Sequence, residues 1–211
     1  MVKMTYVIIA ALVVVVLLIV GLAAFSGGLS SANGGSKAVT SPEPSPAASN
    51  GTVMLSALQA LSVANKDANV TGWKSSQAVV YASDISSESS SDGLSNTWMI
   101  TYILDSNQAL VGVRNGAVDY VNLSMLKPAS ATSPELMTAG VIDSDRASSI
   151  ASGALTSMGV ASTGPASFEL YPGEKNTSLW DIIYPVNGGY YLVRLNATSG
   201  QVIGTTQYNL G

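Results

Sequence analysis

The chain has 211 residues, and its 13 acidic residues outnumber its 9 basic ones, which gives a formal net charge of −4. The basic residues are scattered singly, which disfavours nucleic-acid binding because phosphate contacts need clustered Lys and Arg. With no Cys and no His, the chain can form no disulfide, no thiolate nucleophile, no Ser-His-Asp triad and no metal site built on His or Cys.

The most informative segment is the uncharged run from Tyr6 to Phe25. At about 1.5 Å of rise per residue, a helix of this length covers the roughly 30 Å hydrocarbon core of a bilayer. Lys3 is the only charged residue before the run and Lys37 is the first one after it, so the positive-inside rule places the N-terminus in the cytoplasm and the rest outside.

An uncleaved anchor and a cleaved signal are the two interpretations of this segment. The apolar core of a secretory signal usually has about 7 to 15 residues, which is shorter than this run. The length therefore predicts a signal-anchor over residues 1–25. Secretion after cleavage near Ala24 or Gly27 is the alternative. Residues 26–51, rich in Gly, Ser, Ala and Pro, are too polar to bury a core and predict a stalk.

After the stalk the sequence predicts an α+β fold in which a helix followed by an antiparallel meander occurs twice. The first unit covers residues 52–124, with a helix that Thr52 is expected to cap and an apolar face at Met54, Ala57, Leu58 and Leu61. Residues 125–142 form the connection. The second unit covers residues 143–211, with a helix that Asp143 caps and that ends before Gly159.

Four strands are expected after each helix. Trp98-x-x-x-Tyr102 in the first unit matches Trp180-x-x-x-Tyr184 in the second, and Val113-Arg114 matches Val193-Arg194. Hairpin signals such as Asn115-Gly116 fall between corresponding strands and indicate an internal duplication. The expected strands are 78–83, 97–104, 109–114 and 117–123, then 166–171, 179–186, 190–195 and 201–208.

The second unit ends with Tyr190-Tyr-Leu-Val-Arg-Leu-Asn-Ala-Thr-Ser-Gly-Gln-Val202, and with its Ala-rich helix this ending resembles the PepSY domain. The resemblance covers about residues 143–208, and more loosely 52–123, where Arg114-Asn-Gly-Ala-Val118 replaces the longer loop. It implies an extracytoplasmic module that binds or restrains protein partners, often proteases or cell-wall enzymes, and it supplies no catalytic residues.

Several residues could contact a partner, although each has a simpler structural interpretation. The matched Trp and Tyr residues are expected in the core, because a strand buries one alternating face. Tyr190 and Tyr191 are adjacent and therefore point to opposite faces, so one of them should be exposed. Arg114 and Arg194 occupy equivalent positions, where ion pairs with Asp119 or Asp181 are expected.

The remaining polar motifs give candidate modification sites and no expected cofactor or metal. Asp84 to Gly93 is interpreted as a solubilising loop, and Asp143 with Asp145 as helix-terminal acids rather than cation ligands. Glu169 and Glu174 flank a turn, where a glycosidase pair is not expected. Sequons that could carry N-glycans stand at Asn50, Asn69, Asn122, Asn176 and Asn196.

These observations predict a non-enzymatic, single-pass membrane protein with two PepSY-like units outside the membrane. Its expected role is to bind or regulate an envelope or secreted protein, with no nucleic-acid partner. The alternative is a structural surface protein, such as a filament or coat subunit, because low charge content and exposed sheet edges suit self-association into homo-oligomers.

Overall fold

The computed structural model describes residues 52–76, 80–90, 92–104, 107–125 and 134–210. The expected span Tyr6–Phe25, the stalk over residues 26–51 and the sequon at Asn50 lie outside this part of the chain. Among the described residues, none of the helices combines the length and the apolar character that crossing a bilayer requires.

The described residues form an α+β fold with a single large antiparallel sheet and three α-helices. The elements in chain order are α2 (Ala57–Lys66), α3 (Ala68–Ser76), β1 (Val80–Ser90), β2 (Thr97–Leu104), β3 (Asn107–Arg114), β4 (Ala117–Met125), α4 (Ser144–Ser157), β5 (Ala166–Pro172), the 3-10 turn η2 (Glu174–Asn176), β6 (Ser178–Val186), β7 (Gly189–Asn196) and β8 (Val202–Asn209). In each half four strands follow the helical segment, as expected, although the first half has two helices, α2 and α3, where one was expected.

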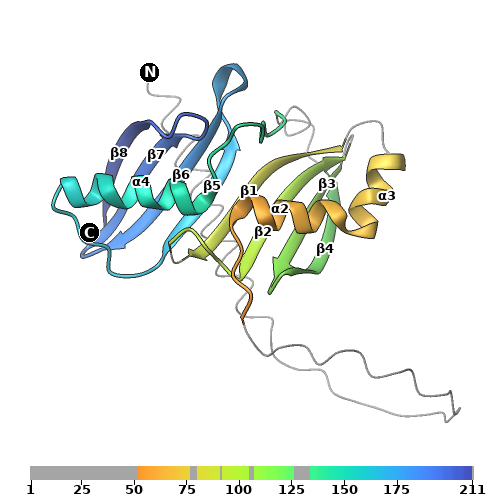
Figure 1. Ribbon diagram of the computed structural model, residues 1–211, viewed down its shortest axis with the longest axis horizontal. Helices are drawn as coiled ribbons and strands as arrows, with labels where there is room; N and C mark the ends of the chain where they lie inside the picture. The colour runs from red at the N-terminus through yellow and green to blue at the C-terminus, as the bar shows by residue number, and fades with distance from the viewer. Residues whose placement is uncertain (1–51, 77–79, 91, 105–106, 126–133, 211) are drawn as a thin grey trace, which may run out of the picture. The chain divides into compact units, whose positions relative to one another are not determined.

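The two halves share one sheet of eight strands, in the order β4-β3-β2-β1-β5-β6-β7-β8. The central pair is β1 with β5, which run antiparallel with Ile85 opposite Leu170. Figure 1 shows α2 and α4 lying across the same face of the sheet, one over each half. The strand order on either side of the central pair is the same, as an internal duplication about a pseudo-two-fold axis requires.

Strand β1 is longer than the sequence analysis expected. The Ser-rich segment from Asp84 was interpreted as a loop, but the strand continues to Ser90 because β2 and β5 pair with its two sides. Two of its buried serines use their hydroxyls as donors: Ser83 donates to the Thr101 carbonyl at 3.4 Å, and Ser90 donates to the Leu94 carbonyl at 3.1 Å. The loop prediction was wrong because this pairing is made across the chain and leaves no local signal.

The helix ends follow local capping chemistry. Helix α2 begins at Ala57 with Ser56 as its N-cap, so the expected cap at Thr52 was wrong; Ser56 and Gln59 form a reciprocal capping box. Helix α4 begins after Asp143, as predicted. Helix α3 was not anticipated, because it buries a single residue, Val70, and has almost no apolar periodicity.

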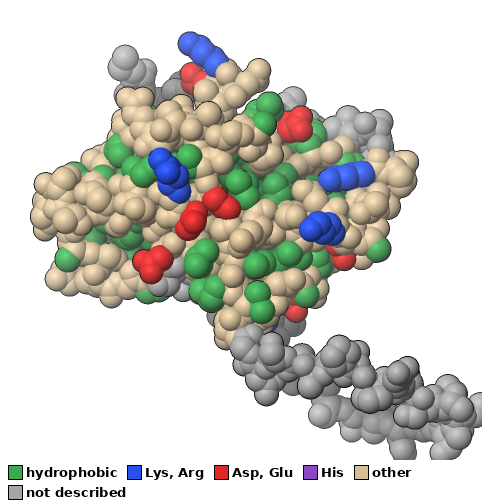
Figure 2. All heavy atoms as spheres, in the orientation of Figure 1, with side chains coloured by type: hydrophobic (Ala, Val, Ile, Leu, Met, Phe, Trp, Pro, Cys, Tyr) green, Lys and Arg blue, Asp and Glu red, His purple; other side chains and the backbone are tan. Residues whose placement is uncertain are grey.

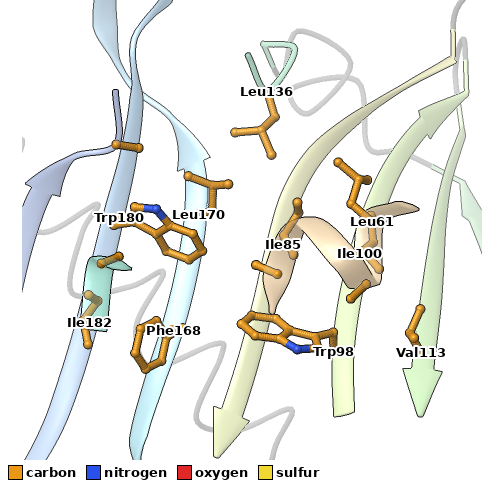
Figure 3. Packing of buried hydrophobic residues seen from close by; sticks show 14 of the residues in the cluster. Leu61, Ile85, Trp98, Ile100, Val113, Leu136, Phe168, Leu170, Trp180 and Ile182 are labelled. Carbon is orange, nitrogen blue, oxygen red and sulfur yellow. The ribbon is translucent and has the colours of Figure 1, made fainter. Parts of the chain in front are cut away.

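The core lies between the helices and the sheet, and its two largest side chains are the matched tryptophans (Figure 3). The Trp98 indole N–H donates to the Leu55 carbonyl at 2.9 Å, and the Trp180 indole N–H donates to the Ile142 carbonyl at 3.0 Å. Each acceptor directly precedes the N-cap of the helix in its own half. The expected core positions of Trp98, Tyr102, Trp180 and Tyr184 are confirmed, since all four are buried.

The N-termini of α2 and α4 meet at a shared set of hydrogen bonds. The Asp143 carboxylate accepts from the backbone N–H of Ser144 at 2.8 Å in its own helix and from that of Leu58 at 3.0 Å in the other. The Ser144 hydroxyl accepts from the Ala57 N–H at 2.9 Å and donates to the Gly93 carbonyl at 2.6 Å. A Cβ atom at position 93 would lie 2.1 Å from the Ser144 carbonyl oxygen, so this contact requires glycine.

Candidate functional site on the far face of the sheet

On the face of the sheet opposite α2 and α4, called the far face below, a row of directly paired residues crosses every strand and is polar from β1 to β7. Directly paired residues on neighbouring strands present their side chains to the same face, so the register defines the row. From β4 to β8 the paired residues are Tyr120, Gly112, Met99, Ser86, Glu169, Asp181, Arg194 and Gly204.

Arg194 and Asp181 form the best-defined polar contact in this row. The Arg194 Nε and Nη2 atoms donate to the two Asp181 carboxylate oxygens at 2.7 and 2.6 Å, which is a bidentate pair. The guanidinium carbon also lies 5.8 Å from the centre of the Tyr171 ring, in cation–π range. These hydrogen bonds raise the pKa of Arg194, and burial followed by the Asp181 charge raises the pKa of the Tyr171 hydroxyl.

Two further carboxyl groups lie on the next two strands of the sheet, Glu169 on β5 and Asp84 on β1. Asp84 on β1 accepts weakly from the Thr101 hydroxyl at 3.5 Å, while its Oδ1 atom is buried and accepts no hydrogen bond from any residue that the structure describes. Burial first, and repulsion from Glu169 second, raise the pKa of Asp84 well above its ordinary value. Loss of hydration and the Asp181 charge likewise raise the pKa of Glu169. Both groups therefore hold their protons more tightly than a free carboxyl.

Exposed tyrosines lie on the far face near both edges of the sheet, Tyr120 on β4, Tyr190 on β7 and Tyr208 on β8. Tyr120, Tyr190 and Tyr208 are 41%, 43% and 40% exposed, and Tyr190 pairs directly with Tyr208. The Tyr120 ring lies over Gly112, where a Cβ atom would come within 2.2 Å of a ring carbon. Tyr191 takes the opposite face, where its hydroxyl lies 3.5 Å from the Met158 sulfur. The predicted separation of Tyr190 from Tyr191 is confirmed.

The two arginines singled out from the sequence have different surroundings. Arg114 pairs with Asp119 at 3.4 Å with both side chains well exposed, whereas the Arg194 pair with Asp181 is largely shielded. Both expected ion pairs form. Four strands separate β3 from β7, so the structure does not bring the two arginines together. The sequence alone did not lead us to place Asp84, Tyr120, Tyr171 and Tyr208 on one surface. The alternation of side chains along each strand could have indicated which face the tyrosines occupy.

Among the sequons that the structure describes, three asparagines are exposed and one is half-buried. Asn69, Asn122 and Asn176 are exposed. Asn196 is half-buried, and its side-chain carbonyl accepts from the backbone N–H groups of Thr198 and Ser199 at 3.0 and 2.9 Å. That pattern is an Asx turn, the structural role expected for this residue. Glycan attachment at all of these positions stays a prediction.

The described residues hold no group of three or more acidic side chains arranged to bind a metal ion. Asp143 is used as a helix cap, as expected, and Asp145 lies exposed in the first turn of α4. Glu174 belongs to the turn η2 and Glu169 to β5. Figure 2 shows the helix-bearing side, where charged side chains are scattered among uncharged surface and form no basic patch.

Comparison with known proteins gives one structural likeness. No protein-family model matches the chain, and no curated protein matches it. A crystal structure described as a "putative lipoprotein" from Clostridium difficile 630 is similar, with a TM-score of 0.51 and 14% sequence identity, over 66% of this chain and 89% of that chain. At this identity the likeness shows the fold alone, and the PepSY resemblance is not confirmed by a family match.

Proposed function

We propose that the chain is a non-enzymatic, membrane-anchored binding protein whose far face engages an envelope or secreted protein. The observation that carries this proposal is that the exposed side chains of Tyr120, Tyr190 and Tyr208 share the far face with the Arg194 and Asp181 pair. Tyrosine and arginine are enriched at protein interfaces because they offer large contact area together with hydrogen-bonding groups. A polar centre fixed by a bidentate pair would orient a partner without ordering new side chains.

The proposal includes two divergent PepSY-like units. Its support is the repeated order of one capped helix and four antiparallel strands, with matched Trp98 and Trp180 contacts in the two halves. The family implies modules that restrain extracytoplasmic proteins. A fold likeness alone does not assign a function, so the far-face residues carry the argument.

Affinity isolation of the full chain from solubilised membranes tests the binding role. We expect one envelope or secreted protein to co-purify with the unaltered chain in a fixed ratio. Tyr120→Ala combined with Tyr190→Ala should reduce recovery of that protein by tenfold or more. Met158→Ala, which alters an exposed side chain on the helix-bearing side, is the matched control. Equal recovery with all three forms would contradict the proposal.

The proposed single-pass topology can be tested separately, because the chain contains no native cysteine. A cysteine introduced at exposed Thr198 should react with a membrane-impermeant maleimide in intact cells. A cysteine at Thr5 should react only after lysis. Reaction of both positions in intact cells, or recovery of the labelled chain in the medium alone, would argue against the anchor.

A structural surface protein is a second candidate function. The observation that favours it is β8, an edge strand whose eight residues are all exposed and uncharged. Such an edge can extend a sheet from one molecule to the next. Large regular oligomers of the purified chain, without a second protein, would support the filament or coat subunit over the binding protein.

A further inference from the structure

Strand β8 differs from the opposite edge of the sheet in the features that prevent edge pairing. Its sequence, Val-Ile-Gly-Thr-Thr-Gln-Tyr-Asn, contains no charge and no proline, and Val202, Ile203 and Tyr208 are each more than a third exposed. Edge strand β4 instead carries Asp119, paired with Arg114. Natural sheets usually protect their edges with charges, prolines or bulges. Within β8 the only such device is a bulge near its start, where Gly204 pairs with Arg194 and Val202 pairs with Leu195.

The outer backbone of β8 can be located from its pairing with β7. The Leu210 N–H donates to the Gly188 carbonyl, and Tyr190 lies opposite Tyr208. In an antiparallel ladder the N–H and C=O groups of alternate residues point to the same neighbour. Those of Tyr208 and Thr206 therefore point to β7, whereas those of Thr205, Gln207 and Asn209 point away from the sheet. These three residues present a regular set of donors and acceptors along β8. This strand lies at the edge of the sheet (Figure 1).

We propose that β8 pairs with β8 of a second copy of this chain across a two-fold axis, joining two sheets into one. Pairing of all three outward residues places Gln207 opposite Gln207 of the second copy, and Thr205 opposite its Asn209. A residue near a two-fold axis lies opposite the same residue of the second copy, so any charge there would meet a like charge. The absence of charge along β8 is therefore what a self-pairing edge requires, whereas an edge that captures a charged peptide would benefit from the opposite sign.

The chain already uses the same geometry internally. Strands β1 and β5, one from each half, pair antiparallel at the pseudo-two-fold axis and make the eight-stranded sheet continuous. The β8 contact would repeat this junction between molecules. It uses the outer backbone edge of β8 and not the far-face side chains of Tyr120, Tyr190 and Tyr208, so it goes beyond the proposed function and can fail without it.

Charge substitution at Gln207 tests the two-fold contact in the full chain purified in a non-ionic detergent. Sedimentation should show a dimer for the unaltered chain. Gln207→Lys and Gln207→Glu should each weaken dimerisation at least tenfold, and mixing the two variants should restore a heterodimer. Leu123→Lys adds the same charge to the exposed surface of β4 and should leave the dimer unchanged. The Gln207 side chain is exposed and its backbone does not bond β7, so these variants should fold, which circular dichroism can verify.

Cross-linking distinguishes this contact from dimerisation through any other segment. With a short bis-maleimide, Gln207→Cys should give covalent dimers in high yield, and Leu123→Cys should give few; no native cysteine competes. A monomer at all concentrations, a dimer indifferent to Gln207→Lys, or equal cross-linking at positions 207 and 123 would each overturn the proposal.

Discussion

The Ser56 hydroxyl donates a hydrogen bond of 2.5 Å to the Asp143 carboxylate, and this bond joins the N-caps of the two matched helices. The residues are 87 positions apart in the chain, yet they hold equivalent places in the two halves. Because Asp143 also accepts from the backbone of both helices, one carboxylate lies at the positive ends of two helix dipoles. The two halves are therefore joined at a single polar junction as well as through the shared sheet.

Removal of Asp143 should cost more than the loss of an ordinary cap. Asp143→Ala leaves the N–H groups of Ser144 and Leu58 without their carboxylate acceptor, and we expect it to lower the free energy of unfolding by roughly 2 to 3 kcal/mol. Denaturant titration of the full chain in detergent measures the change. Asp145→Ala, in the exposed first turn of the same helix, should cost less than about 1 kcal/mol. Equal costs for the two variants would contradict the double capping role.

The matched tryptophans should respond alike to substitution. Trp98→Phe and Trp180→Phe each remove buried indole volume and one N–H hydrogen bond to a carbonyl, so each should cost about 1 to 3 kcal/mol. The Leu55 carbonyl still accepts from the Ser95 N–H at 2.9 Å. Trp73→Phe, at a half-buried edge contact with Tyr102, should cost less. A stability change confined to one of the two matched positions would contradict their equivalence.

Much of the fold was accessible from the sequence because its signals are local. Alternation and hairpin residues placed β2 to β8 to within one or two residues, and Asp143 marked the start of α4 correctly. The length of β1 was not predicted, because its serines become strand residues only through pairing with β5. The closeness of Asp84 and Glu169 on the far face depends on that same pairing, which places β1 next to β5. A contact between segments so far apart leaves no pattern in either one.

The two arginines should differ in their contribution to stability. Arg194→Met leaves the shielded Asp181 carboxylate without its bidentate partner, so we expect a loss of roughly 2 to 4 kcal/mol. Arg114→Met breaks an exposed pair and should cost under about 1 kcal/mol. Denaturant titration of both variants under identical salt provides the comparison, and a larger loss for Arg114→Met would refute this assignment.

Stability should depend on pH through the far-face carboxyl groups. The raised pKa values of Asp84 and Glu169 mean that the folded chain holds these protons to higher pH than the unfolded chain. Folding therefore takes up protons, and stability falls as the pH rises from the unfolded carboxyl pKa of about 4 through the higher folded pKa values. Asp84→Asn should reduce this fall and raise the melting temperature at pH 7 relative to the unaltered chain, with little benefit near pH 3.

Exposed Glu135 provides the control for that experiment. Glu135→Gln should leave the pH profile of the melting temperature unchanged. A melting temperature of Asp84→Asn that falls with rising pH as steeply as that of the unaltered chain would show that Asp84 is not responsible.

Site-specific photo-cross-linking in intact membranes tests the proposed partner surface most directly. A photoreactive amino acid at position 120 or 190 lies on the far face, and one at exposed position 149 lies on α4 on the other side. We expect positions 120 and 190 to cross-link to the same second protein and position 149 not to cross-link to it. Cross-links to that protein only from position 149, or from none of the three, would contradict the far face as the binding surface.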